Sequence, residues 1–346
     1  MNASRSAPSN ITPSNTTPSI SAPAFLDLYD ALVDQNVRIS EAALGFQRDE
    51  LMDIEKRVPA SMQNILWGIA KKQGAPDHIG LIVGQQINDE AHGMMAHLMN
   101  YTADLREALK LYERYVDVMS EYEGIEIQPT HWGCRIVYKS QFESESNISA
   151  VERSLSSLLT RANYLTGEDI HPVKVGFQHA RPSYYAEYEK AFKCPVQFGQ
   201  ENSYIDVDNL VLDYKVHSAN QYIKEIIKEH IEKFVGVLNK KDSLSYLVKS
   251  MLSERLNDGG GNSSLIADEL NMSRQTLHRK LKQSGLNFRT LLESVRKEKA
   301  VEYLYSDTLT LEEISEKLGF KEPSAFYRAF KGWFKQSPGN FKKGLS

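Results

Sequence analysis

The chain has 346 residues, 41% of them hydrophobic and 25% charged, which is ordinary for a soluble globular protein and long enough for two domains. Its formal net charge is −4, and its two cysteines, Cys134 and Cys194, stand in no CxxC spacing, which argues against a disulfide scaffold or a zinc module. The sequence contains no apolar run near the ~20 residues of a membrane span and no apolar core of a signal peptide. We therefore expect a cytoplasmic protein with free thiols, no cofactor, no metal and no membrane partner.

The beginning of the chain differs in composition from the rest. Residues 1–23 are mostly Ser, Thr, Asn and Pro. Such a segment cannot bury enough surface to offset its ordering entropy, so we predict a disordered tail. Residues 24–213 are predicted to form a mixed α+β domain in which helices come first and short strands come second.

Helical periodicity dominates residues 24–119, and Thr102 is predicted to cap the last of these helices. The apolar stripes at helical spacing are Phe25, Leu28, Leu32 and Val33; Ile65, Leu66, Ile69 and Ala70; and Leu105, Leu109, Leu111, Tyr112 and Tyr115. Strand-like runs come next, at residues 125–127, 135–138, 173–177 and 204–207, around a helix expected at 148–165.

Residues 214–243 are predicted to form a connecting helix. Its apolar residues recur at a spacing of 3.6, which gives one apolar face. Two interpretations stay open: this face forms a dimer contact, or it packs on its own domain. The positions concerned are Ile223, Ile227, Ile231, Phe234 and Leu238.

The segment 244–346 contains an internal repeat and is predicted to be an all-α domain. One copy begins at Ile266 and the other at Ile314. Each has an apolar pair four apart, a small residue directly after the first apolar one, a turn, and a second apolar pair four apart. The second copy carries one extra turn residue. This pattern is typical of two helix-turn-helix motifs, because the small residue lets two helices cross closely.

The turns and helix ends of both copies have suitable residues. Gly319 adopts a positive φ freely and Asn271 does so acceptably. Ser273 is predicted to cap the second helix of the first copy. Thr310 begins a capping box with a Glu three residues later, and Pro323 fits a first helical turn.

The face opposite the apolar pairs is free to contact another molecule, and it is basic. From Lys240 to Ser346 the chain holds 19 Lys and Arg against 13 Asp and Glu, a net charge of +6, whereas the rest has a net charge of −10. A basic third on an acidic body indicates a polyanionic partner for that third. The predicted DNA-binding residues are Ser273, Arg274, Gln275, Thr276, His278, Arg279 and Lys282 in the first copy, and Ser324, Tyr327, Arg328 and Lys331 in the second.

The motifs resemble those of the AraC/XylS family of transcription regulators. The resemblance lies in the stretch from Ile314 to Phe341, with its Leu-Gly-Phe, Arg-Ala-Phe-Lys and Ser-Pro, and in the helix Met272–Leu281. Upstream, His171-Pro-Val-Lys-Val-Gly-Phe-Gln-His179 and the Pro, Tyr and Phe residues after it resemble the arabinose-binding-like N-terminal domain of the ornithine-responsive branch. The similarity spans roughly residues 25–341.

The resemblance implies that residues 24–213 bind a small-molecule effector and form a homodimer. It also implies that residues 244–346 bind double-stranded DNA, probing two successive major-groove segments, and that RNA polymerase is a partner. The bases would face the positions of Gln275, His278, Arg279 and Arg328, while Pro323 and Ala325 offer no hydrogen-bonding side chain. Activation is commoner than repression in this family, and the location is the cytoplasm, at the nucleoid when DNA is bound.

Several residues of the predicted N-terminal domain are candidates for contact with the effector. An adaptable apolar pocket suits Met94, Met95, Met99, Trp67 and Tyr101, although such residues more often form core. Arg106 and Arg135 are conceivable partners of a ligand carboxylate. His92 and His97 are five apart and diverge on a helix, and the sequence has no catalytic motif, so we expect no enzyme.

Two other functions remain to be weighed against a ligand-responsive regulator. The first is an architectural DNA-binding protein whose N-terminal domain serves only association. The second is an enzyme tethered to DNA, which would need a catalytic constellation that the sequence lacks.

Overall fold

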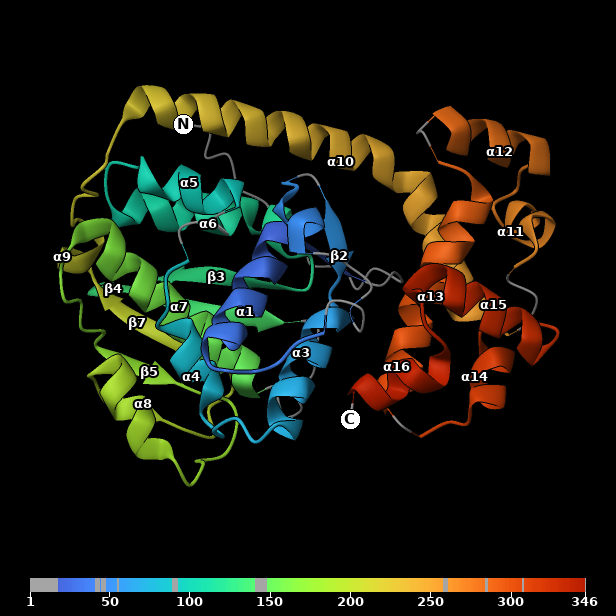
Figure 1. Ribbon diagram of the computed structural model, residues 1–346. Helices are drawn as coiled ribbons and strands as arrows, with labels where there is room; N and C mark the ends of the chain where they lie inside the picture. Colours follow the sequence, from blue (N-terminus) through green and yellow to red (C-terminus); the bar gives the residue numbers. More distant parts are fainter. Residues whose placement is uncertain are drawn as a thin grey trace.

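The chain folds into an α+β N-terminal domain and an all-α C-terminal domain with two helix-turn-helix motifs, as the sequence predicts (Figure 1). One long helix, α10 (Gln221–Arg255), runs from the first domain into the second. The computed structural model describes residues 18–40, 44, 48–54, 56–88, 93–140, 148–257, 261–283, 286–306 and 308–345, with the main chain alone at 236–243, 246, 305–306 and 344–345.

A five-stranded sheet with the order β3-β4-β7-β5-β6 forms the centre of the N-terminal domain. All neighbouring strands are antiparallel except β5 and β6, which are parallel. A separate two-stranded sheet pairs β1 with β2. The strands are β1 (Ser19–Ser21), β2 (Arg57–Pro59), β3 (Glu123–Pro129), β4 (Gly133–Ser140), β5 (Lys174–Gly176), β6 (Val196–Gln197) and β7 (Tyr204–Asp208).

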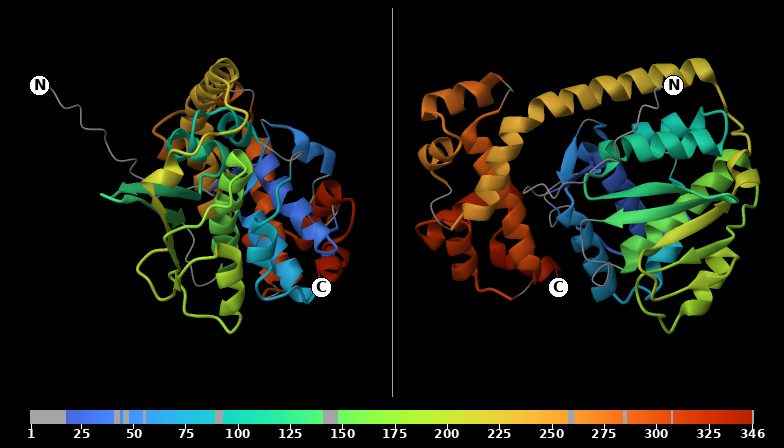
Figure 2. Two further views of the ribbon diagram at one scale, coloured as in Figure 1. Left: turned by 90° about the vertical axis from the view of Figure 1, so that its left-hand side faces the viewer. Right: turned by 180° about the vertical axis from the view of Figure 1, so that it is seen from behind.

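The two faces of the central sheet have different chemistry. On the inner face Ile136, Val175 and Ile205 are at most 2% exposed, and they belong to one apolar core with residues of α6 and α7. On the outer face Arg135 donates two hydrogen bonds to Asp206, at 2.8 and 2.9 Å. The helices lie on the inner side, and the view from behind shows the strands in front of them (Figure 2).

The N-terminal helices follow the predicted apolar stripes closely. Phe25, Leu28 and Leu32 are fully buried, while Val33, also placed on this stripe, is 41% exposed. The elements are α1 (Ala22–Asp34), the short 3-10 helix η1 (Arg48–Met52), α3 (Ser61–Lys72), α4 (Ile79–Gly84), α5 (Met94–Asn100), α6 (Leu105–Met119), α7 (Ile148–Thr166), α8 (Tyr185–Phe192) and α9 (Asn209–Leu212).

The predicted disordered tail ends earlier than residue 23, so its boundary was wrong. Residues 1–17 lie outside the described part of the chain. Ser19 already donates its backbone N–H to Glu121, at 2.7 Å, and Arg57 donates to the Ser19 hydroxyl at 2.6 Å. Ile20 is 2% exposed. The burial of this one apolar side chain and the ladder with β2 fix the segment, and neither is visible in local composition.

The predicted cap of α6 was also wrong. The Asp104 carboxylate accepts the N–H of Glu107 at 3.0 Å, and Glu107 in turn accepts the N–H of Ala103 at 2.8 Å. The Thr102 hydroxyl instead donates to the carbonyl of Met99, at 2.8 Å. Asp104 therefore satisfies the free N–H groups of the first turn, two residues later than expected.

Two glycines allow α4 to cross α7 at close range. A Cβ at Gly80 would lie 2.3 Å from the carbonyl oxygen of Ser149, and one at Gly84 would lie 1.9 Å from the hydroxyl of Ser156 and 2.7 Å from the carbonyl oxygen of Arg153. No side chain fits at either position without moving the helices apart.

A buried carboxylate lies beside this crossing. Glu152 is fully buried, and its Oε1 accepts hydrogen bonds from the hydroxyls of Tyr184, at 2.9 Å, and of Tyr188. Its Oε2 has no hydrogen-bond partner among the described residues. Burial raises the pKa of Glu152 to about 7, helped by the nearby Asp77 and opposed by the two tyrosine hydroxyls.

The first part of α10 packs on its own domain. Ile231 is fully buried against Met95, Leu98, Tyr115 and Val118, with Ile227 and Phe234 at the edge of this cluster. The structure therefore favours the second of the two interpretations of the amphipathic stretch 223–238, although the side chain of Leu238 lies outside the described set. The helix also continues past the expected linker boundary at residue 243 and ends at Arg255.

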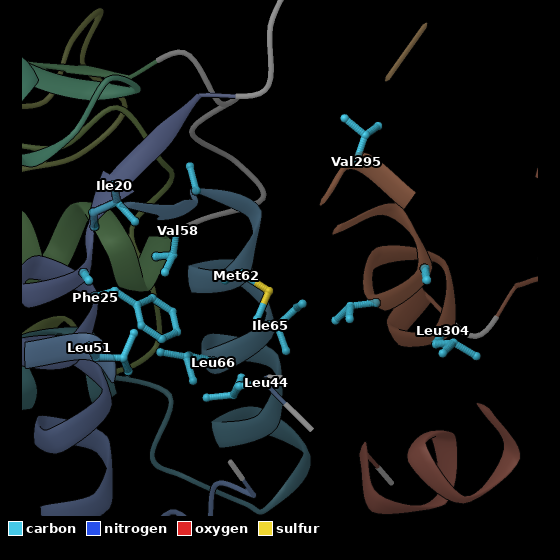
Figure 3. Packing of buried hydrophobic residues seen from close by; sticks show 14 of the residues in the cluster. Ile20, Phe25, Leu44, Leu51, Val58, Met62, Ile65, Leu66, Val295 and Leu304 are labelled. Atoms are coloured by element: carbon cyan, nitrogen blue, oxygen red, sulfur yellow. The ribbon is translucent and has the colours of Figure 1, made fainter. Parts of the chain in front are cut away.

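The C-terminal domain packs on the N-terminal domain through α13. Met62 and Ile65 of α3 point toward α13, where Val295 and Leu304 belong to the same apolar cluster (Figure 3). The helices of this domain are α11 (Ser263–Glu269), α12 (Arg274–Gln283), α13 (Phe288–Ser306), α14 (Leu311–Lys317), α15 (Pro323–Phe334) and α16 (Pro338–Leu345).

Candidate nucleic-acid interface

The two copies of the repeat fold in the same way. In the first turn the N–H of Met272 donates to the carbonyl of Ala267 at 3.0 Å, and in the second the N–H of Phe320 donates to Ser315 at 3.1 Å. Ala267 and Ser315 are the small residues predicted to allow close crossing, and both are at most 1% exposed. The repeat seen in the sequence is therefore a repeat of helix-turn-helix structure.

Both turns use the left-handed backbone conformation at the predicted residue. Asn271 has φ 51° and Gly319 has φ 68°. The second turn is tighter, since a Cβ at Gly319 would lie 2.2 Å from the carbonyl oxygen of Leu256, just after α10. The second turn requires both a positive φ and the absence of a Cβ, which only glycine provides, whereas the first turn requires only a positive φ, which asparagine can adopt.

The predicted helix caps are present. The Ser273 hydroxyl accepts the N–H of Thr276 at 3.1 Å, in the first turn of α12. Thr310 accepts the N–H of Glu313 at 3.2 Å, and the Glu313 carboxylate accepts the N–H of Thr310 at 2.7 Å, which completes a capping box at α14. Pro323 occupies the first turn of α15.

The apolar side of each second helix fixes which side remains free. Leu277 and Leu281 of α12 are each 1% exposed. Phe326 and Phe330 of α15 are fully buried, and Phe330 packs on Phe341 of α16 with ring centroids 5.2 Å apart. Because these pairs face the core, the opposite faces of α12 and α15 are directed to solvent.

All of the predicted DNA-binding side chains except Thr276 are exposed. Thr276 is half-buried and its hydroxyl lies 2.9 Å from that of Ser273. Ser324 donates a weak hydrogen bond to Glu322 at 3.3 Å. Among the described residues no carboxylate forms an ion pair with Arg279 or Arg328. These guanidinium groups are therefore available to phosphates and base edges, and α12 and α15 lie beyond α13 as seen from the N-terminal domain (Figure 1).

Helix α13 holds the second motif in place through a residue that the sequence did not single out. Arg296 donates to the carbonyls of Leu318 and Gly319, at 2.9 and 2.8 Å, and its guanidinium lies 4.2 Å from the centroid of the Phe320 ring. Trp333 of α15 donates its indole N–H to Glu293 at 2.9 Å. An arginine on an amphipathic helix gives no sequence signal of such a role, because most lie on solvated faces.

The two arginines considered for a ligand carboxylate are already paired. Arg135 is bound by Asp206, whose side chain is 2% exposed, and its guanidinium lies 3.8 Å from the Tyr204 ring centroid. Arg106 donates to Asp213 at 2.8 Å. These contacts hold β4 to β7 and α6 to the end of α9.

Of the apolar pocket candidates, Met99 lines a cavity in the N-terminal domain. Met95 and Trp67 are buried core residues, Met94 is partly buried beside Met95, and Tyr101 is half-buried. The cavity lies between α6, α7 and the inner face of the sheet and has a volume of about 60 Å³.

The described part of the chain shows neither a metal site nor a membrane helix. It contains no group of three His, Cys, Asp or Glu side chains placed to hold a metal ion. No described helix is long and apolar enough to cross a membrane. His92, one of the two histidines weighed as a metal pair, lies outside the described residues.

Comparison with known proteins gives a match for each domain. Residues 40–216 match the family described as the arabinose-binding domain of AraC transcription regulators, N-terminal. Residues 266–344 match a helix-turn-helix domain that covers both motifs.

Two curated transcription regulators and one solved structure are also similar to this chain. The chain is 26% identical over 266 residues to the ornithine utilization regulator of Pseudomonas aeruginosa, covering 77% of this chain and 78% of that protein. It is 28% identical over 195 residues to the transcriptional regulator VirS of Mycobacterium tuberculosis, covering 56% and 57%. The solved structure of the transcriptional regulator CdpR from Pseudomonas aeruginosa aligns over 93% of this chain and 98% of that one, with 19% identity and a TM-score of 0.45.

Proposed function

Because the chain belongs to the AraC family of DNA-binding transcription regulators, and is not an enzyme, we propose that it is a ligand-responsive activator. In this proposal α12 and α15 enter two adjacent major-groove segments of double-stranded DNA, roughly one turn or ~34 Å apart. The observation that supports it best is the same turn geometry in both motifs, with exposed cationic faces opposite the core pairs.

The proposed roles of the side chains follow from their chemistry. Arginine donates to two acceptors of guanine at once, and glutamine can do the same at adenine, so Gln275, Arg279 and Arg328 suit base edges, with His278 beside them. Lysine is a point charge that suits phosphates. The remaining residues of the proposed interface are Ser273, Arg274, Thr276, Lys282, Ser324, Tyr327 and Lys331.

The proposal extends to the partners of the N-terminal domain. Residues 24–213 bind a small-molecule effector and form a homodimer, and the DNA-bound protein contacts RNA polymerase in the cytoplasm, at the nucleoid. Ile231 on the inner face of α10 packs on its own domain, so the homodimer contact is made by other residues.

Two arginine variants test the base-reading role. Replacing Arg279 or Arg328 with Ala should weaken binding to the protein's own promoter DNA by about 1–3 kcal/mol, with a smaller loss on random DNA. The measurement is a binding titration on both DNAs at two salt concentrations. Arg38→Ala is the matched control, because Arg38 is an exposed arginine of the N-terminal domain whose hydrogen bonds with Gln73 involve only its backbone. Equal losses on both DNAs would assign phosphate contacts instead.

A further inference from the structure

The two oxygens of the buried Glu152 carboxyl have different surroundings. Its Oε1 accepts hydrogen bonds from the hydroxyls of Tyr184 and Tyr188, at the beginning of α8 and within it. Its Oε2 lies against α4, because a Cβ added at Gly80 would be 2.6 Å from that oxygen. Water does not reach Oε2, and the atom has no hydrogen-bond partner among the described residues. One oxygen is therefore doubly satisfied, while the other has no donor that would stabilise a negative charge.

The elements around Glu152 provide no basic side chain to compensate a charge on it. Among the described residues no lysine or arginine forms an ion pair with Glu152. Its neighbour in α7, Arg153, pairs instead with Asp27 of α1. Just before α4 lie Asp77, whose charge opposes ionisation of Glu152, and His78, whose ring centroid is 5.9 Å from that of Tyr184. The neutral acid therefore suits this site better than the carboxylate.

His179 lies on the far side of Tyr188 from the carboxyl. Its Nδ1 is 2.9 Å from the carbonyl oxygen of Ala180, so this nitrogen carries the proton when the ring is neutral. Its Nε2 is 3.3 Å from the Tyr188 hydroxyl, which donates its own proton to Glu152. Burial lowers the pKa of His179 and raises the pKa of Glu152 to about 7. Just below pH 7 both groups are thus uncharged, and a rise in pH ionises the carboxyl.

Ionisation of Glu152 would place a full negative charge against the backbone of α4. The two helices cross at Gly80 and Gly84, so no side chain lies between them at these positions that a rotation would move aside. Burying an unpaired charge is far more costly than burying a neutral carboxyl group that accepts hydrogen bonds. The least costly response is a movement of α4 away from α7, which admits water to Oε2.

Helix α4 belongs to the apolar cluster that joins the two domains. Its Ile79 and Val83 are buried in the same cluster as Met62 and Ile65 of α3 and Val295 of α13 (Figure 3). Within this cluster α4 packs on α1, α1 packs on α3, and α3 packs on α13. A displacement of α4 therefore disturbs the packing through which the N-terminal domain contacts the DNA-binding domain.

The position of the domain contact decides the direction of the effect. Helices α12 and α15 lie beyond α13 as seen from the N-terminal domain, so the contact between α3 and α13 leaves the DNA interface uncovered (Figure 1). The contact instead limits the orientations of α13, which holds the turn of the second motif through Arg296. A looser contact has to be ordered again when DNA binds, and this ordering lowers the affinity.

We propose that Glu152 is a pH switch. The neutral acid keeps α4 packed on α7 and the two domains in contact, whereas loss of its proton moves α4 and weakens the binding of promoter DNA. This inference rests on the proposed function, since it names a means of regulating the same DNA interface. The signal is the proton, and the change takes place as the pH rises through neutrality.

The ionisation itself is measured by carbon-13 NMR of the full-length protein labelled at the glutamate carboxyl groups. Comparison with Glu152→Gln assigns the signal of Glu152, which should titrate between pH 6 and pH 8. Tyr184→Phe removes one hydrogen bond that favours the anion, so it should move the midpoint to higher pH. A Glu152 carboxyl that is already ionised at pH 6 would overturn the proposal.

Promoter binding measures the effect on function. From pH 6 to pH 8 the affinity of the wild type should fall by roughly fivefold or more beyond any fall in Glu152→Gln. This variant is the reference because it is neutral at every pH and retains His278 and the other histidines, whose charges also change with pH. If Glu152→Gln fails to fold, Tyr184→Phe still decides, since the midpoint of its promoter affinity must move together with that of its carboxyl group.

Amide hydrogen exchange tests the coupling between the domains without DNA. At pH 8 the amides of α4 and α13 should exchange faster in the wild type than in Glu152→Gln, and at pH 6 the two proteins should exchange alike. Faster exchange in α4 alone, or the same dependence of promoter affinity on pH in both proteins, would overturn the proposal. A lack of promoter preference at every pH would contradict the proposed function, and the exchange of α13 would still decide whether the switch reaches the DNA-binding domain.

Discussion

The turn of the second helix-turn-helix motif gives a sharp test of how tightly α10 packs on it. Replacing Gly319 with Ala adds one methyl group at a residue with φ 68°, where the new Cβ would lie 2.2 Å from the carbonyl oxygen of Leu256. A left-handed conformation costs an L-residue about 1–2 kcal/mol. Displacing a backbone oxygen in a packed site adds about 1–3 kcal/mol more, so we expect a total loss of ~2–5 kcal/mol.

Gly74 supplies a matched control for the steric part of this cost. It has φ 76° and nothing within 4 Å of an added Cβ. Gly74→Ala should therefore lose only the conformational cost, about 1–2 kcal/mol. Urea unfolding of the full-length variants, monitored by the signal of each domain, measures both losses.

The difference between the two variants is the decisive quantity. Gly319→Ala should also weaken promoter binding, because the carbonyl of Gly319 accepts a hydrogen bond from Arg296 and any shift of this turn moves α15. Equal losses in Gly319→Ala and Gly74→Ala would refute the claim that the end of α10 packs tightly on this turn.

Two further substitutions test buried polar groups, and one tests a helix crossing. The buried Ser315 hydroxyl has no partner among the described residues, so Ser315→Ala should be neutral or stabilise by up to ~1 kcal/mol in urea unfolding, and a loss above that would contradict its isolation. The pKa of Glu152 is raised to about 7, so its contribution to stability is full below its ordinary pKa near 4.5 and is lost as pH rises to 7, by on the order of 3 kcal/mol. Glu152→Gln should remove this fall in stability with rising pH, and thermal unfolding at pH 4.5–8 measures it. A variant whose stability depends on pH as the wild type's does would refute the prediction. Burial lowers the pKa of the neighbouring His179, so this histidine makes stability rise with pH and opposes the effect of Glu152. The quantity to compare is therefore the difference in unfolding temperature between wild type and variant at each pH. Gly84→Ala should lower the free energy of unfolding by about 1–3 kcal/mol, because the new Cβ would overlap the carbonyl of Arg153. Thermal unfolding of the variant measures this loss, and a variant as stable as the wild type would disprove the close crossing.

Local signals in the sequence predicted the DNA-binding domain well. Asn271, Ser273, Thr310 and Pro323 each act within one or two helical turns, and the structure has each of them in its predicted conformation or hydrogen bond. The eleven proposed DNA contacts remain predictions; ten of these side chains are exposed, which agrees with the role, and Thr276 is half-buried.

Features that depend on distant partners were not predictable in this way. Arg296 lies on an amphipathic helix, and its role depends on the turn at Gly319, whose carbonyl accepts its hydrogen bond. Ile20 lies in a stretch whose composition indicates disorder, yet pairing with β2 orders it. The Thr102 error is smaller, since Thr102 and Asp104 both suit a cap and the register of the helix decides between them.

The N-terminal domain was predictable in class but not in its cavity. Periodicity indicated the helices before residue 119, α7 and most strands of the sheet, but it missed α8 and α9. The cavity is formed by residues from α6, α7, α9 and the sheet that are ordinary core residues in the sequence. Arg106 and Arg135, which the sequence offered as partners of a ligand carboxylate, are held by Asp213 and Asp206.

The central claim is sequence-specific binding of DNA by the two helix-turn-helix motifs. The most direct test is a titration of the full-length protein with DNA from upstream of its own and neighbouring genes, and with random DNA of equal length, at two salt concentrations. We predict a preference for the upstream DNA that persists at the higher salt, since base contacts add to the salt-dependent phosphate contacts. Equal affinity for both DNAs at each salt concentration would contradict the account.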